Sequence, residues 1–193
     1  IPKKGPAIIA SNHLSFLEQL LPHSPPEVFA GFELGNQKFA LCYLRVIDPE
    51  GRGVAAELGP AFEALKASLE ADADPGLAAN LALEALCARP FAHRLECAIA
   101  LFEPAHMRVS LYNAGCPEAV FWASSEAGRS ITPGTAHQPL ERRHLRETAD
   151  HFQNLPPLHL AAHDLVVAAS AGFCGRGAGG YANGVRALGE TLD

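Results

Sequence analysis

Asp48 stands where a protein could hold a hard cation. It follows an apolar run, residues 38–47, that is typical of a buried strand, and it precedes a turn with two glycines, Gly51 and Gly53. From Val54 onward, apolar residues recur at steps of three and four, which predicts an amphipathic helix. Carboxylates bind hard cations well, but an aspartate also caps a turn through its own backbone. The local pattern favours the cap, and the ligand remains the alternative.

Two residues near the N-terminus suggest a different chemistry. His13 and Glu18 have the spacing of the HxxxxD motif of the glycerolipid acyltransferases, which they resemble with glutamate in place of aspartate. Residues 49–51 are similar to that family's later glycine-containing motif, but they follow too soon after His13, and nothing afterwards fits. A short Asn-His pair before a helix is more often a capping feature. An acyltransferase is therefore the alternative of another class.

Histidines and arginines gather in the second half of the chain. Three histidines recur at steps of seven residues, with three arginines among them: His137, His144, His151, Arg142, Arg143 and Arg146. On one helix they would form a phosphate or metal patch, but residues 146–160 fit a strand equally well, which would scatter the histidines. Because the spacing of the histidines does not decide between a helix and a strand, we favour a solvated surface for them. The three arginines remain a candidate docking patch for an acidic partner.

Composition and charge exclude several classes of protein. The chain has 193 residues and a net charge of −6, without the basic stripe of a nucleic-acid-binding protein. No apolar run approaches the roughly 20 residues that span a bilayer. The five cysteines are scattered and never in CxxC spacing, which indicates reduced thiols in a cytoplasmic protein. Because the sequence begins at Ile1 and not at a methionine, we expect a fragment or a processed product.

The apolar periodicity predicts a strand hairpin, then two helices, then further hairpin strands. We expect strands at residues 27–34, 38–47, 94–102, 107–113, 119–123 and 165–170. Two helices are expected, from residue 54 to about 71 and from residue 75 to about 89. Residues 20–26 are rich in proline, so we interpret residues 1–26 as a connector and residues 27–193 as one domain. The pattern is typical of an α+β domain.

Several short motifs follow one another in an order that a known family shares. They lie at residues 48–53 (Asp-Pro-Glu-Gly-Arg-Gly), 77–81, 95–102, 113–117, 138–140 and 160–172. In this order they resemble the SpoIIE-type branch of the metal-dependent protein serine/threonine phosphatases, which have the protein phosphatase 2C (PP2C) fold. The resemblance implies a β-sandwich of two mostly antiparallel sheets flanked by helices. It also implies a site at one edge where aspartates hold two Mn²⁺ or Mg²⁺ ions.

The resemblance assigns some residues to that site and finds others replaced. Asp48 matches the bridging carboxylate, and Pro49 would lend its backbone carbonyl, which proline keeps. Phe32 and Ala171 stand where the family has aspartates, and Arg52 replaces a histidine of the glycine turn. One carboxylate cannot offset the charge of two divalent cations or complete their coordination.

Two glutamates are candidates to replace the missing acids. Glu33 and Glu50 could substitute as ligands, which would preserve an active Mn²⁺- or Mg²⁺-dependent phosphoserine or phosphothreonine phosphatase. The favoured interpretation is instead weak or absent metal binding in a catalytically impaired domain. Such a domain would act as a regulatory or interaction module in bacterial partner-switching signalling. The resemblance implies a phosphorylated or acidic partner of the anti-sigma-factor-antagonist type.

Overall fold

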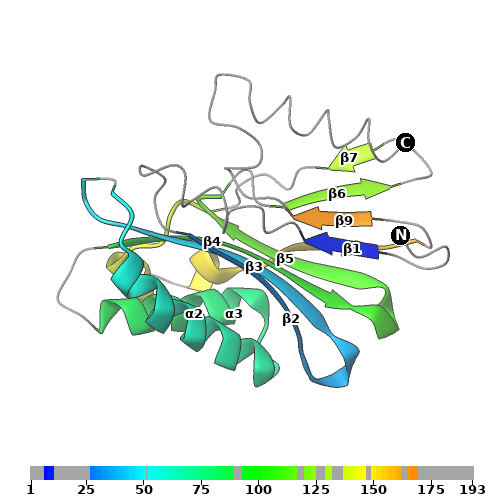
Figure 1. The fold of residues 1–193 in the computed structure, drawn as a ribbon, viewed down its shortest axis with the longest axis horizontal. Coiled ribbons are helices and arrows are strands. Elements are labelled where there is room, and N and C mark those ends of the chain that lie inside the picture. Colours follow the sequence, from blue (N-terminus) through cyan, green and yellow to red (C-terminus); the bar gives the residue numbers. More distant parts are fainter. Residues whose placement is uncertain are drawn as a thin grey trace.

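Two β-sheets and a pair of helices form the part of the chain that the structure describes (Figure 1). The computed structural model describes residues 7–10, 27–50, 52–88, 93–116, 120–124, 129–131, 137–146, 149–161 and 165–168. A five-stranded sheet carries the helices on one face, and a four-stranded sheet lies on its other side (Figure 1). The helices are therefore outside a two-sheet sandwich.

The five-stranded sheet is antiparallel throughout. Its strands are, in spatial order, β2 (Glu27–Glu33), β3 (Phe39–Ile47), β4 (Arg94–Glu103), β5 (Arg108–Ala114) and β8 (Leu155–His159). β3 and β4 are buried along nearly their whole length, because both faces of the sheet are covered. The first four strands confirm the sequence prediction to within one residue at each end.

The helices α2 (Ala55–Glu70) and α3 (Pro75–Cys87) pack against each other and against this sheet. Their buried side chains, such as Leu65 and Leu83, meet Leu44 of β3 and Ile99 of β4 in one apolar core. Asp74 is the N-cap of α3: its Oδ1 accepts a hydrogen bond of 2.9 Å from the backbone N–H of Leu77 in the first turn. Both helices were predicted, and both are confirmed.

The opposite face of the five-stranded sheet forms a second core. It contains the alternate residues of the same strands, including Leu41, Tyr43, Ala100, Phe102 and Leu111. This face is turned toward the four-stranded sheet (Figure 1). That sheet has the order β1 (Ala7–Ala10), β9 (Leu165–Ala168), β6 (Val120–Ser124), β7 (Arg129–Ile131). Only β1 and β9 pair in parallel among its described strands, so the predicted α+β sandwich of mostly antiparallel sheets is confirmed.

One strand comes from the segment that we interpreted as a connector. Residues 7–10 form β1 and pair with β9, with Ala7 opposite Leu165 and Ala10 opposite Ala168. This part of residues 1–26 therefore belongs to the sandwich. The remainder of that segment, including His13 and Glu18, lies outside the described residues.

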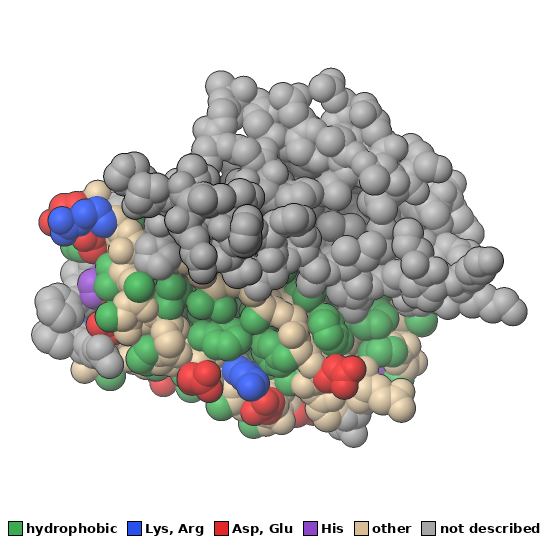
Figure 2. All heavy atoms as spheres, viewed as in Figure 1, with side chains coloured by type: hydrophobic (Ala, Val, Ile, Leu, Met, Phe, Trp, Pro, Cys, Tyr) green, Lys and Arg blue, Asp and Glu red, His purple; other side chains and the backbone are tan. Residues whose placement is uncertain are grey.

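Charged side chains mark the described surface. Figure 2 shows acidic and basic groups over the helices and the β2–β3 hairpin, and a separate mixed group over the turn between β3 and α2. Leu77 of α3 is the one large apolar side chain that is clearly exposed within the described ranges, at 45% of its area. None of the described helices is long and apolar enough to cross a membrane.

Candidate functional site

The turn after β3 is closed by hydrogen bonds between Asp48 and Arg52. The backbone N–H of Asp48 donates to the carbonyl of Arg52 over 2.9 Å, and the N–H of Arg52 donates to Asp48 Oδ1 over 2.8 Å. The guanidinium adds a third bond, from Nε to Asp48 Oδ2 over 2.6 Å. Both carboxylate oxygens of Asp48 are thus engaged by a single residue. The cap that the local pattern favoured is therefore present.

The charge of Asp48 is balanced from within the turn. The Asp48 carboxylate is largely buried, whereas the Arg52 side chain is 74% exposed and also bonds Glu50 Oε2 over 2.9 Å. Burial by itself would raise the pKa of Asp48, but the hydrogen bonds and positive charge of Arg52 hold that pKa below its ordinary value of 3.8. Asp48 is therefore an anion whose partner is already in place.

The described residues around Asp48 do not fit a two-cation centre. A divalent cation needs several free oxygen ligands, yet the oxygens of Asp48 accept bonds from Arg52. Glu50 lies on the same turn, but it is exposed and paired with the same guanidinium. Within the described ranges, no group of three or more His, Cys, Asp or Glu side chains is arranged to hold a metal ion. Ala171, the other position at which the family has an aspartate, lies outside those ranges.

The register of the β2–β3 hairpin separates Phe32 and Glu33 from Asp48. Phe32 lies opposite Ala40 and Glu33 opposite Phe39, at the hairpin end of the sheet. Asp48 follows the last residue of β3, eight positions beyond Ala40, which at about 3.3 Å per residue is roughly 26 Å away. The structure thus brings neither residue to the expected site. Phe32 instead packs edge to face on Phe62 of α2, with ring centroids 6.2 Å apart.

Glu27 is the β2 carboxylate that lies at the same end of the sheet as Asp48, and the sequence analysis missed it. It pairs in register with Arg45, and its Oε2 accepts a hydrogen bond of 2.6 Å from the hydroxyl of Tyr43. Arg45 in turn donates from Nε to Glu96 Oε2 over 2.6 Å. Strands were expected at residues 27–34 and 38–47, and counting back along both strands from the turn between them, Gly35–Gln37, would have placed Glu27 there.

The comparison with known proteins agrees with this architecture. The PP2C domain of SiaA from Pseudomonas aeruginosa superposes with a TM-score of 0.58 at 13% identity, over 86% of this chain and 63% of that one. The RsbU and RsbW domains of a Mycobacterium tuberculosis protein give a TM-score of 0.52 at 15% identity, over 72% of this chain and 37% of that one.

This chain has the PP2C fold. At these identities the likeness concerns the fold alone, and the chain spans 37% and 63% of the two structures. The PP2C phosphatase domain of SpoIIE from Bacillus subtilis, with part of its regulatory domain, also matches, with a TM-score of 0.48 at 13% identity over 70% of this chain and 38% of that one. No family model and no curated protein sequence matches.

The Asn-Ala-Gly motif of this PP2C fold has a structural role. The side chain of Asn113 accepts a hydrogen bond of 3.0 Å from the N–H of Cys116 and donates one of 2.6 Å to its carbonyl. Gly115 between them has φ +76°, and a Cβ there would lie 2.8 Å from Pro139. The motif therefore closes a tight turn, in which Cys116 is buried.

The histidine series lies together in this PP2C fold, contrary to the expected solvated surface. His144 is only 2% exposed, and its ring lies 4.4 Å from that of His151 and accepts the N–H of Glu141 at Nδ1. His137 stacks on Tyr112 at 5.3 Å, and the Tyr112 hydroxyl donates to the carbonyl of His151. The solvated-surface prediction is wrong for His144, because the segment turns back onto β5 through these ring contacts.

The three arginines of the expected docking patch are exposed beside the C-terminal end of α3. Arg142 Nη2 donates to the carbonyl of Cys87, the last residue of that helix, over 2.6 Å. Arg143 lies 3.1 Å from Glu141, with both side chains in solvent, and Arg146 is exposed as well. Exposed pairs of this kind contribute little to stability. Arg143 and Arg146 therefore remain accessible to a partner.

Proposed function

We propose that this PP2C-fold domain is a catalytically impaired phosphatase relative that acts as a regulatory or interaction module. One observation carries the proposal: Arg52 engages both oxygens of Asp48. Phosphoester hydrolysis in metal-dependent phosphatases needs clamped cations that polarise the phosphoryl group and supply hydroxide. A guanidinium neutralises a carboxylate, but unlike a metal ion it cannot bind and activate a water molecule. The turn thus keeps its shape but lacks the cations that phosphoester hydrolysis needs.

The proposed partner is an acidic or phosphorylated regulatory protein in bacterial partner-switching signalling. One structural neighbour carries RsbU and RsbW domains together, which supports a signalling context. The exposed Arg143 and Arg146 support recognition of carboxylate or phosphate groups, for which arginine is well suited. The type of partner, an anti-sigma-factor antagonist, rests on the family resemblance of the sequence motifs.

Metal affinity and turnover on the same protein test the proposal. Calorimetry with Mn²⁺ and Mg²⁺ should give dissociation constants no tighter than about 1 mM, the weak end for carboxylate sites. Release of phosphate from a phosphoserine peptide in the presence of Mn²⁺ should stay at background. Micromolar metal binding together with metal-dependent turnover would contradict the proposal and establish the alternative, an active Mn²⁺- or Mg²⁺-dependent serine/threonine phosphatase.

A matched variant separates loss of the site from loss of folding. Asp48→Asn should leave metal binding and phosphate release unchanged, because neither depends on Asp48 in the native chain. A drop in either quantity, in a variant that still melts cooperatively, would show that Asp48 serves as a ligand. The acyltransferase alternative built on His13 and Glu18 gains no support from a PP2C fold.

A further inference from the structure

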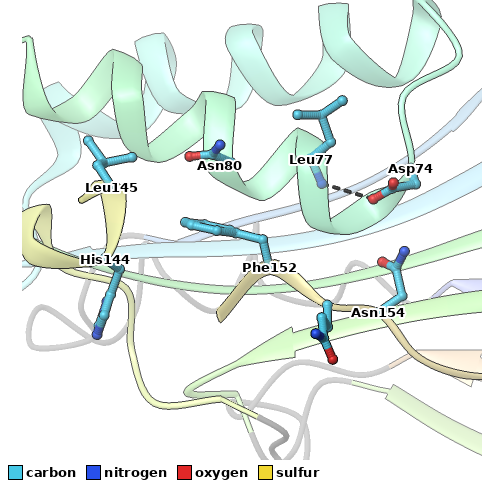
Figure 3. Close-up of a pocket in the computed structure, with 8 residues that line it drawn as sticks. Asp74, Leu77, Asn80, His144, Leu145, Phe152 and Asn154 are labelled. Carbon is cyan, nitrogen blue, oxygen red and sulfur yellow. Dashed lines mark hydrogen bonds between the residues drawn. The ribbon is translucent and has the colours of Figure 1, made fainter. Parts of the chain in front are cut away.

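A hollow lies between α3 and the segment that follows β7 in the chain. We call residues 142–146 and 149–154 the strap, because they run along α3. The hollow has a volume of about 750 Å³ and is lined by Leu77 and Asn80 of α3 and by Leu145, Phe152 and Asn154 of the strap. Figure 3 shows the Phe152 ring extending beneath Asn80, whereas Leu77 lies nearer the N-terminal end of α3 and its side chain points away from Phe152.

The strap is fastened to α3 at both ends of the hollow. At the C-terminal end of the helix, Arg142 donates to the carbonyl of Cys87 over 2.6 Å. At the N-terminal end, the N–H of Gly76 donates to Asn154 Oδ1 over 2.9 Å. A Cβ on Gly76 would come within 1.8 Å of the Phe152 carbonyl, so the two backbones touch there. The hollow is therefore preformed, and a ligand need not organise it.

The chemistry of the hollow is mixed along its length. Its apolar lining residues are Leu145 and Phe152 of the strap and Leu77 of α3. Asn80 contributes a side-chain Oδ1 that is buried and accepts no hydrogen bond from the described residues. Buried acceptors are seldom left unsatisfied without a reason. A ligand with an apolar side chain and an N–H donor would complete both features.

The charge at one end selects the kind of ligand. Arg143 and Arg146 are exposed next to the point where Arg142 fastens the strap, on a chain whose net charge is −6. At the other end lies the exposed carboxylate of Asp74. A segment that runs along α3 would thus place acidic groups at the arginines and keep them away from Asp74.

We propose that this hollow is the docking groove for an acidic protein segment that carries a large apolar side chain. The apolar side chain seats against Phe152 and Leu145, a backbone N–H reaches Asn80 Oδ1, and carboxylates or phosphates meet Arg143 and Arg146. α3 is about 20 Å long at 1.5 Å per residue, which an extended segment of about six residues matches. The inference rests on the proposed function as an interaction module and specifies where the partner binds.

A synthetic peptide tests the groove without knowledge of the partner. The probe is a fluorescein-labelled peptide of about eight residues, with glutamates at one end and a Leu-Phe pair toward the other. Its reference has lysines in place of the glutamates. Titrations of the full chain in EDTA should show saturable binding of the acidic probe and none of the reference, with NMR shift changes at Leu77, Asn80 and Phe152.

Two variants and one control complete the test. Arg143→Glu with Arg146→Glu, and separately Phe152→Ala, should each weaken binding by at least about tenfold, because central anchors and charge pairs dominate such contacts. Lys66→Glu, a charge reversal on α2 outside the groove, should change affinity by less than about twofold. Phe152 is partly buried against the core, so cooperative thermal unfolding of each variant checks that it folds.

The outcomes separate this inference from the proposed function. Absence of binding up to about 1 mM probe, equal binding of the reference, or affinity insensitive to both variants would overturn the groove. Because the titrations exclude metal, such a result leaves catalytic impairment standing. Conversely, tight Mn²⁺ binding with turnover would overturn the impaired phosphatase and leave a peptide-binding groove intact.

Discussion

The guanidinium of Arg52 lies against the carboxylate of Asp48, with Nε 2.6 Å from Oδ2, while the backbone N–H of Arg52 lies 2.8 Å from Oδ1. The pair closes the turn that separates β3 from α2, and Ile47 and Gly53 form an isolated β-bridge across that turn. The hydrogen bonds that close the turn also occupy both oxygens of Asp48. Among the described residues, Asp48 is the only carboxylate that the family resemblance assigns to a metal. Stability of the turn and metal binding therefore compete at Asp48.

Arg52→Gln should raise the pKa of Asp48 toward its ordinary value of 3.8. The variant removes the guanidinium bond and its positive charge, which lower the pKa, but it keeps the backbone bond, so the rise should be partial. Following the Asp48 carboxyl carbon by NMR between low and neutral pH measures it. Mn²⁺ affinity should stay weak, because one carboxylate remains a poor site. An unchanged pKa would show that Arg52 does not hold Asp48 in solution.

Gly76→Ala should destabilise the domain by about 1–3 kcal/mol, the usual cost of forcing extra atoms into a packed contact. The new Cβ would meet the Phe152 carbonyl, which is backbone and cannot rotate away. Gly35→Ala is the control, because a Cβ there has no neighbour within 4 Å, and it should change stability by less than about 0.5 kcal/mol. Urea denaturation measures both. Equal effects of the two substitutions would mean that the strap does not touch α3.

Much of the fold could be predicted from apolar residues that alternate along strands or recur at helical spacing. The strands and helices from residue 27 to 114 each bury a clear face, and their bounds were predicted closely. Three strands escaped, of which β7 is only three residues long. β8 contains Pro156 and Pro157, which made its segment ambiguous, and it lies at the edge of its sheet, where proline is tolerated. β1 is only four residues long and depends on β9, far along the chain.

The candidate site was less predictable than the fold, because it depends on register. The sequence motifs identified Asp48, but they placed Phe32 beside it, and only the pairing of β2 with β3 shows that Phe32 lies at the far end. A shift by a few positions along a strand moves a side chain by more than 10 Å. The contact between His144 and His151 likewise depends on two short 3-10 helices, which have no distinctive sequence period.

Thiol reactivity should distinguish Cys87 from the other described cysteines. Burial raises the pKa of Cys42, Cys97 and Cys116, and a buried thiol is also shielded from reagents. Cys87 is half-buried at the end of α3; burial raises its pKa too, and the nearby Arg142 opposes that rise.

In a Cys174→Ser background, Ellman's reagent should therefore detect one reactive thiol in the native protein and four after unfolding, since the chain has five cysteines. Cys87→Ser in the same background is the control and should abolish the native signal. Rapid reaction of two or more thiols in the folded protein would contradict the buried positions of the other three.

Glu103 should make the stability of the domain depend on acid pH. It is 8% exposed at the β4–β5 hairpin, where its Oε2 accepts a hydrogen bond of 2.7 Å from Arg108 Nε, and Lys38 Nζ lies 3.4 Å from its Oε1. Burial alone would raise its pKa, but the bonds and charges of Arg108 and Lys38 lower the pKa below 4.5, its ordinary value. The folded state therefore binds this proton less tightly than the unfolded state does.

Because the pKa is lower in the folded state, the contribution of Glu103 is fully present above the unfolded value of 4.5 and is lost as the pH falls through the folded pKa. Glu103→Gln should lower the free energy of unfolding by about 1–2 kcal/mol at pH 7, a typical loss for charge-assisted hydrogen bonds. The difference from the native protein should shrink steadily below pH 4.5, as denaturation in urea across this range measures. Glu63→Gln on the exposed face of α2 should show no such difference at any pH. A deficit in Glu103→Gln that persists unchanged into strong acid would mean that the side chain stabilises the hairpin by packing and not by its charge.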